Sequence, residues 1–143
     1  MNRILFSLFA VLALVFSAPA YADGDRIITF DQLPQASQTF LKQYFPDRTP
    51  ILVKADRDDY EVAYENGESV EFTRKGEWKS IDCKFKPVPE ALIPAAIKER
   101  IATNYPNASI IKISKDRKGY EVELNNGLDI EFNNRFVIVD IDD

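Results

Sequence analysis

Apolar and polar residues follow two periodic patterns along the chain, and each pattern occurs twice. Apolar residues at helical spacing predict two amphipathic helices, which end before Pro46 and before Pro106 because proline cannot continue a helix. The apolar stripes are Phe40, Leu41, Tyr44 and Phe45 in the first helix, and Leu92 or Ile93, Ile97, Ile101 and Tyr105 in the second. After each proline the pattern changes to alternation, which is typical of half-buried strands.

Eight strands are expected, four after each helix. Their approximate ranges are 51–55, 60–65, 69–73 and 77–82, and then 110–115, 120–125, 128–133 and 136–141. Turn-forming pairs such as Asn66-Gly67 and Lys75-Gly76 lie between these runs. The pattern therefore predicts an α+β fold in which two tandem α-β-β-β-β repeats form an antiparallel sheet with the helices on one face.

The duplication extends to the residues themselves. A shift of 60 positions aligns residues 31–83 with residues 91–143 without a gap. Matching pairs include Pro34 with Pro94, Pro46 with Pro106, Tyr60-Glu61-Val62 with Tyr120-Glu121-Val122, Asn66-Gly67 with Asn126-Gly127, and Glu71-Phe72 with Glu131-Phe132. We expect a first repeat over residues 23–83 and a second over residues 84–143.

The first 22 residues have the layout of a secretory signal peptide. Arg3 provides the positive start, residues 4–16 form an apolar run, and Ala20-Tyr21-Ala22 matches a cleavage site. The run is too short to span a bilayer, which takes about 20 residues. We therefore expect cleavage after Ala22, an address in the periplasm or outside the cell, and no membrane span in the mature chain.

Composition excludes several classes of function. The expected mature chain carries 17 basic and 23 acidic residues, so its net charge of about −6 disfavours nucleic acid binding. There is no histidine, and the single cysteine, Cys83, rules out a disulfide within the chain and a thiolate zinc site. We expect Cys83 to be buried as a small apolar residue. No nucleotide-binding or hydrolase motif occurs, so the chain is not predicted to be an enzyme.

Each helix is expected to cover the aromatic and aliphatic face of its strands. The hairpin turns then fix which residues share the open face. A three-residue turn over residues 65–67 sets Glu61 opposite Glu71, and the neighbouring turns set Lys54 opposite Glu61 and Lys79 opposite Glu71. Each acid of this row then has a lysine beside it, so no binding partner is needed to explain the row.

The same face of the second repeat has a different make-up. The predicted register gives one row of Ser114, Glu121, Glu131 and Val139, and a neighbouring row of Lys112, Glu123, Asp129 and Ile141. Four acids then face one another with one lysine among them, and Val137 adds a third aliphatic side chain. Large aliphatic residues beside acids on an open face are typical of a surface that something covers.

The main functional hypothesis is a protein-binding surface whose partner carries basic groups at its rim. The candidate partner-binding residues are Glu121, Glu123, Asp129, Glu131, Val137, Val139, Ile141, Leu52 and Ile81. Two alternatives remain: the chain itself covers the final strand, or a divalent cation binds among the acids, since hard cations take oxygen ligands. No residue is assigned as a metal ligand and no cofactor is predicted, because carboxylates on a flat sheet converge poorly.

The order and spacing of these motifs resemble the PepSY-like domains that are grouped with β-lactamase-inhibitor-like proteins of Gram-negative bacteria. The motifs of the first copy are Leu33-Pro34, Tyr44-Phe45-Pro46, Tyr60-Glu61-Val62, Val70-Glu71-Phe72 and Gly76-Glu77-Trp78; those of the second are Ile93-Pro94, Tyr105-Pro106, Tyr120-Glu121-Val122 and Ile130-Glu131-Phe132. The likeness covers nearly all of the expected mature chain. It departs at residues 135–138, where the glycine and tryptophan of the first copy are missing.

The resemblance implies tandem α+β units whose strands form one curved sheet, with the open face left concave. In the inhibitor after which the group is named, the concave face grips an enzyme. The resemblance thus implies an exported binding module, with inhibition of a secreted or envelope enzyme as one form of that function. The alternative is a small-ligand or cation-sensing envelope protein that uses the acids of the second repeat.

Overall fold

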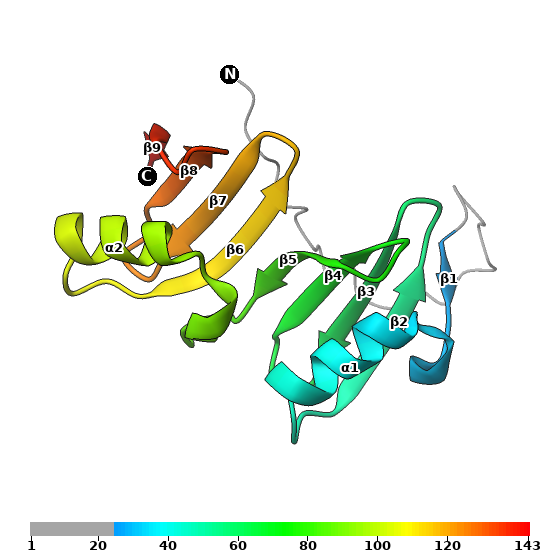
Figure 1. Cartoon of the computed structure of the whole chain (residues 1–143). Helices are drawn as coiled ribbons and strands as arrows, with labels where there is room; N and C mark the ends of the chain where they lie inside the picture. The colour runs from blue at the N-terminus through cyan, green and yellow to red at the C-terminus, as the bar shows by residue number, and fades with distance from the viewer. Residues whose placement is uncertain (1–24) are drawn as a thin grey trace.

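The computed structural model describes residues 25–143, so the expected signal peptide lies outside the described residues. Nine antiparallel strands form one sheet whose spatial order follows the chain from β1 to β9 (Figure 1). The strands are β1 (Arg26–Ile27), β2 (Pro50–Ala55), β3 (Asp59–Tyr64), β4 (Ser69–Thr73), β5 (Trp78–Asp82), β6 (Ile110–Asp116), β7 (Gly119–Leu124), β8 (Asp129–Asn133) and β9 (Ile138–Asp142). The helices are α1 (Gln35–Tyr44) and α2 (Ala95–Asn104), each preceded by a short 3-10 turn, η1 (Phe30–Gln32) or η2 (Glu90–Leu92).

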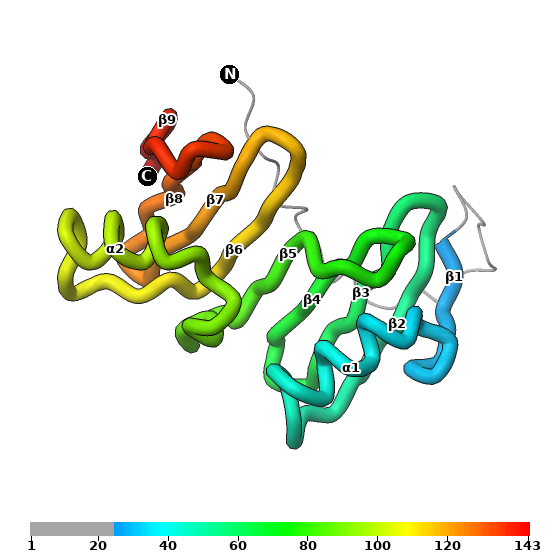
Figure 2. Tube along the Cα trace, viewed as in Figure 1, coloured from blue at the N-terminus to red at the C-terminus, as the bar shows by residue number. Residues whose placement is uncertain are grey.

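This architecture is α+β, as predicted, with helices on one side of the sheet (Figure 2). The short strand β1 was not expected from the sequence. No helix within residues 25–143 is long and apolar enough to cross a membrane. We refer below to residues 25–83 as the first half and to residues 84–143 as the second half.

Both helices end where the prolines predict. The N–H of Phe45 donates to the carbonyl of Leu41 over 2.9 Å, and Tyr105 donates in the same way to Ile101 over 2.7 Å. The next residue in each case is proline, which has no N–H to continue the helix. The helices are thereby held at matching places over their strands.

The core lies between the helices and the apolar face of the sheet, as expected from the alternation. Val62, Val70 and Phe72 of the first half are fully buried, and so are Val122 and Ile130 of the second half. These residues form one continuous cluster with the buried positions of both helices. Cys83 is part of this cluster and is 3% exposed. Burial raises the pKa of its thiol to about 12, and the prediction that Cys83 is buried is confirmed.

The pairings of the central hairpins are confirmed. In the first half, Lys54 pairs with Glu61 and Glu61 with Glu71. The corresponding pairings in the second half are Ser114 with Glu121 and Glu121 with Glu131, and in the next row Lys112 with Glu123 and Glu123 with Asp129. Three-residue turns with glycine in the left-handed position fix this register, since Gly67 and Gly127 have φ of 90° and 91°.

The pairings predicted for the last strand of each half are wrong by one residue. A β-bulge follows the pair Phe72 and Trp78, so Glu71 faces Ser80 instead of Lys79. The same bulge after Phe132 and Ile138 sets Glu131 opposite Asp140 instead of Val139. An extra residue in one strand moves every later side chain of that strand to the opposite face.

Two predicted members of the open face therefore lie elsewhere. Ile81 pairs with Val70, is 0% exposed and belongs to the core. Ile141 pairs with Ile130, on the side of the sheet that carries the core, and stays 48% exposed because β9 is an edge strand. Leu52 remains on the open face, where it pairs with Ala63.

The two halves meet where β5 pairs with β6. Ser80 faces Ser114 and their hydroxyl groups are 3.1 Å apart, while Ile81 faces Ile113 and Asp82 faces Lys112. On this junction the Lys115 ammonium group lies 3.9 Å from the centre of the Trp78 ring. The sheet is thus continuous across the boundary between the halves.

Candidate functional site: an acidic face on the second half

Six carboxylates share the open face of β7, β8 and β9. We call them the acidic face: Glu121, Glu123, Asp129, Glu131, Asp140 and Asp142. The residues between them along β7 and β8, such as Val122 and Ile130, point into the core, which places these acids on the other side of the sheet. The alternation that builds the core therefore also builds this face.

The bulge in β9 completes the acidic face. It brings Asp140 opposite Glu131 and Asp142 opposite Asp129, where the sequence had predicted Val139 and Ile141. Directly opposed side chains on one face have Cβ atoms about 4.5–5.5 Å apart. A hollow of about 30 Å³ results, and its lining consists of Glu121, Asp129, Glu131, Asp140 and Asp142.

The acidic face is partly withdrawn from water. Glu121 is only 7% exposed, although it is a charged residue in the middle of a sheet face. Burial also raises the pKa of the Glu123 carboxyl group, and the neighbouring Asp129 adds to this effect, while Lys112 opposes it. Placing carboxylates so close together costs free energy, which a bound cation would recover.

The first half differs at three of the six equivalent positions. Sixty residues before Glu123, Asp129 and Asp140 stand Ala63, Ser69 and Ser80. Their registers are the same, since Ala63 pairs with Ser69 and Glu71 with Ser80. The fold therefore accepts small neutral side chains at these places, and the acids of the second half are not required by the architecture.

The open face of the first half is balanced by lysines. The Lys54 ammonium group lies 3.5 Å from the Glu61 carboxylate, and that of Lys79 lies 3.0 Å from Asp59. Burial, followed by repulsion from Glu71, raises the pKa of Glu61 to about 7, with Lys54 acting in the opposite direction. The sequence predicted Lys79 directly opposite Glu71, but Ser80 takes that position and the Lys79 ammonium group contacts Asp59.

The remaining predicted site residues are divided between surfaces. Val137 lies just before β9, where its carbonyl group accepts the N–H of Asn133, and it is 47% exposed. Val139 is the extra residue of the bulge and is 55% exposed. Val137, Val139 and Ile141 are thus spread along the edge of the sheet and do not form an apolar patch between the acids.

Sequence reasoning missed Asp140 and Asp142, although a signal was present. Ile138 and Ile141 are apolar but three positions apart, as are Trp78 and Ile81 in the first half. A regular strand cannot place residues three apart on the same face, because its side chains alternate. Two apolar residues at this spacing near a turn therefore indicate a bulge.

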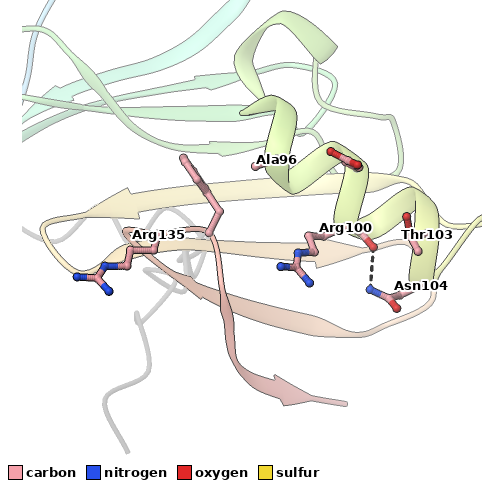
Figure 3. A pocket seen from close by; sticks show the side chains of 7 residues that line it. Ala96, Arg100, Thr103, Asn104 and Arg135 are labelled. Carbon is pink, nitrogen blue, oxygen red and sulfur yellow. Dashed lines mark hydrogen bonds between the residues drawn. The ribbon is translucent and has the colours of Figure 1, made fainter.

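A larger hollow lies on the helix side of the second half, between α2 and the turn before β9 (Figure 3). Its lining includes Arg100, Thr103, Asn104 and Arg135, and its volume is about 400 Å³. In the first half the corresponding turn is held against the helix, because the Ser37 hydroxyl group donates to the Gly76 carbonyl over 3.1 Å. Phe136 replaces that glycine in the second half. The lining residues are mostly exposed and polar, so this hollow has little of the character of a ligand pocket.

Within residues 25–143, no group of three or more acidic, cysteine or histidine side chains is already arranged to hold a metal ion. The acidic face thus offers oxygen donors of the right kind without a finished coordination shell. Calcium takes six to eight such ligands in flexible geometry, so rotation of the side chains is part of any binding there.

A family model described as "Putative beta-lactamase-inhibitor-like, PepSY-like" matches residues 24–67 and 58–140. The chain belongs to this family. The resemblance seen in the sequence is thereby confirmed. A comparison with curated proteins finds no match.

Solved structures of similar proteins come from Bacteroides species. A periplasmic protein of the DUF2874 family from Bacteroides vulgatus is 44% identical, with 85% of this chain and 99% of that chain covered and a TM-score of 0.82. A protein from Bacteroides thetaiotaomicron named as a "putative calcium-regulated periplasmic protein" is 45% identical, with 83% and 97% covered and a TM-score of 0.79. A further periplasmic protein of unknown function from Bacteroides vulgatus is 34% identical, with 84% and 100% covered and a TM-score of 0.79. All three proteins are described as periplasmic.

Proposed function

We propose that this protein is a non-enzymatic periplasmic binding module whose acidic face binds a positively charged ligand. One observation carries the proposal: the second half has Glu123, Asp129 and Asp140 where the first half has small neutral residues. Crowding carboxylates in a half-buried hollow costs stability, and the first half, with acids at only three of the six equivalent positions, carries less of that cost. A cationic ligand gives these acids a role.

The same reasoning extends to the organisation of the chain. We infer that residues 23–83 and 84–143 are two copies of one unit, of which the second has gained the acidic face. We also infer that the chain is exported and that its signal peptide is cleaved after Ala22, which agrees with the description of the similar proteins as periplasmic.

Calcium is the ligand that we favour. All the side chains around the hollow offer carboxylate oxygens, which are the donors that calcium prefers. The Bacteroides thetaiotaomicron protein named as calcium-regulated is 45% identical to this chain. Bound calcium neutralises the acidic face and so changes what the open face of the sheet can bind.

Thermal unfolding in the presence of calcium tests this proposal. A ligand that binds only the folded state stabilises it by about 2.7 kcal/mol at a hundred times its dissociation constant. We expect calcium to raise the melting temperature of the protein and to lose this effect in the variant E123A/D129S/D140S, which copies the first half. The variant D58N/E65Q/E90Q removes three exposed acids outside the acidic face, and should keep the wild-type response. Equal responses of the two variants would contradict the proposal.

A protein partner with basic groups is the second candidate, and the family description favours it. The family is described as β-lactamase-inhibitor-like, and both helices of residues 25–143 lie on the other side of the sheet. Affinity capture from periplasmic extract with the wild type and with E121K/E131K tests whether the acidic face binds a protein. A partner of the acidic face is expected to be captured by the wild type alone, with and without a calcium chelator. Capture of the same proteins by both forms would exclude it.

A further inference from the structure

We propose that β9 is a docking edge, onto which an extended segment of another protein adds as a tenth strand. The geometry of the chain itself points to this, because β9 is equivalent to β5, and β5 already carries an added strand, β6. This inference concerns the edge of the sheet, and it shares Asp140 and Asp142 with the acidic face.

The edge of β9 is open and carries exposed aliphatic side chains. Among residues 25–143, β9 has a neighbouring strand on one side only, which is β8. Val139 and Ile141 are 55% and 48% exposed along this strand. The opposite end of the sheet is the two-residue strand β1, whereas β9 offers five residues. An edge of this kind presents unpaired backbone groups that can bind a further strand.

The junction between the halves shows how such a strand docks. Ile81 is completely buried once Ile113 pairs with it, whereas its equivalent, Ile141, remains half-exposed. Asp82 faces Lys112 in the same junction. An antiparallel strand added to β9 in this register would place a β-branched residue on Ile141 and a basic residue on Asp142.

The third position of the junction specifies the occupant further. Ser80 faces Ser114, but the equivalent of Ser80 in β9 is Asp140. An acid at this place favours a second basic residue in the added strand. The structure therefore assigns to the occupant a basic, aliphatic, basic triplet in extended conformation.

A second copy of this chain fits the edge less well. Pairing of β9 with β9 would bring Asp140, Asp142 and Asp143 of one copy against the same acids of the other, and like charges across a ladder are destabilising. The equivalent of β6 in the first half, β2, is already paired with β1 through Ala55 and Lys54. The acids of β9 thus oppose self-association while they admit a basic strand.

A peptide with the sequence of β6 provides the probe. We would titrate the full mature protein with the segment Ser109–Asp116 carrying Ser114→Lys, and follow binding by NMR and by amide hydrogen exchange. We expect binding with new protection of the β9 amides. Two control peptides separate the contribution of charge from that of backbone pairing. One carries glutamate in place of both basic residues of the triplet. The other keeps every side chain but is N-methylated at alternate backbone nitrogens. Both controls should bind at least about tenfold more weakly.

Variants of the protein and its association state complete the test. Ile141→Glu should weaken binding of the peptide by about tenfold, whereas Val137→Glu, which lies before the strand, should leave it unchanged. No binding up to about 1 mM, or equal binding of the N-methylated peptide, would overturn the proposal. Protection of the β9 amides without peptide, together with a dimeric mass in sedimentation, would show that a second copy occupies the edge and would likewise overturn it.

Discussion

At the scale of single residues, Glu61 shows what a buried carboxyl group costs this sheet. It is 8% exposed and faces Glu71, so burial and repulsion raise its pKa to about 7. An acid whose folded-state pKa is raised stabilises the fold while it is protonated. Its contribution is present below the unfolded-state pKa and is lost as the pH rises through about 7.

The substitution Glu61→Gln removes this titration. We expect the variant to gain about 2 kcal/mol over the wild type at pH 8 and little at pH 4.5, because only the ionised carboxylate is penalised. Urea unfolding of both proteins across this pH range measures the difference. The exposed residue Glu65 provides the control, since Glu65→Gln should follow the wild type at every pH. A constant difference between Glu61→Gln and the wild type would refute the explanation.

At the scale of elements, an ion pair in the first half takes the place that two apolar residues take in the second half. The buried Glu68 of the turn before β4 accepts a 2.7 Å hydrogen bond from Arg48 Nε, and the Arg48 side chain is 28% exposed. The equivalent residues of the second half are Leu128 and Ala108, which pack against the core cluster. The ion pair is therefore not needed by the fold, because an apolar pair fills the same place.

This comparison predicts the cost of breaking the pair. Arg48→Ala alone should destabilise the protein by about 3 kcal/mol, because it leaves the Glu68 carboxylate buried without its partner. Adding Glu68→Leu reproduces the second half and should restore most of the loss. Urea unfolding of the single and double variants decides the point. A double variant as unstable as the single one would mean that the surroundings of Glu68 are specific to the ion pair.

The elements also show which parts of the structure could be predicted from the sequence. Alternation and turn residues identify the strands, and the three-residue turns fix the pairing of Glu61 with Glu71 and of Glu121 with Glu131. The bulges were missed because regular pairing was continued from Trp78 and from Ile138. A bulge moves all later residues of the strand by one position. The predicted register therefore placed Val139 and Ile141 at the positions that Asp140 and Asp142 occupy in the structure.

At the scale of the whole molecule, the sheet combines a balanced half with an acidic half. Lysines accompany the acids on the open face of the first half, at Lys54 and Lys79. In the second half five carboxylates surround one small hollow. Since β5 and β6 join the halves into a single sheet, the acidic face continues into the open face of the first half.

The central claim is that the acidic face binds calcium, and a residue-resolved NMR titration with calcium tests it most directly. We expect saturable shifts centred on Glu121, Asp129 and Asp140, with the equivalent positions of the first half unmoved, and loss of these shifts in E123A/D129S/D140S. Magnesium, which demands stricter octahedral geometry, should bind more weakly. Shifts spread evenly over both halves, or the same titration curve for the wild type and the variant, would contradict the account.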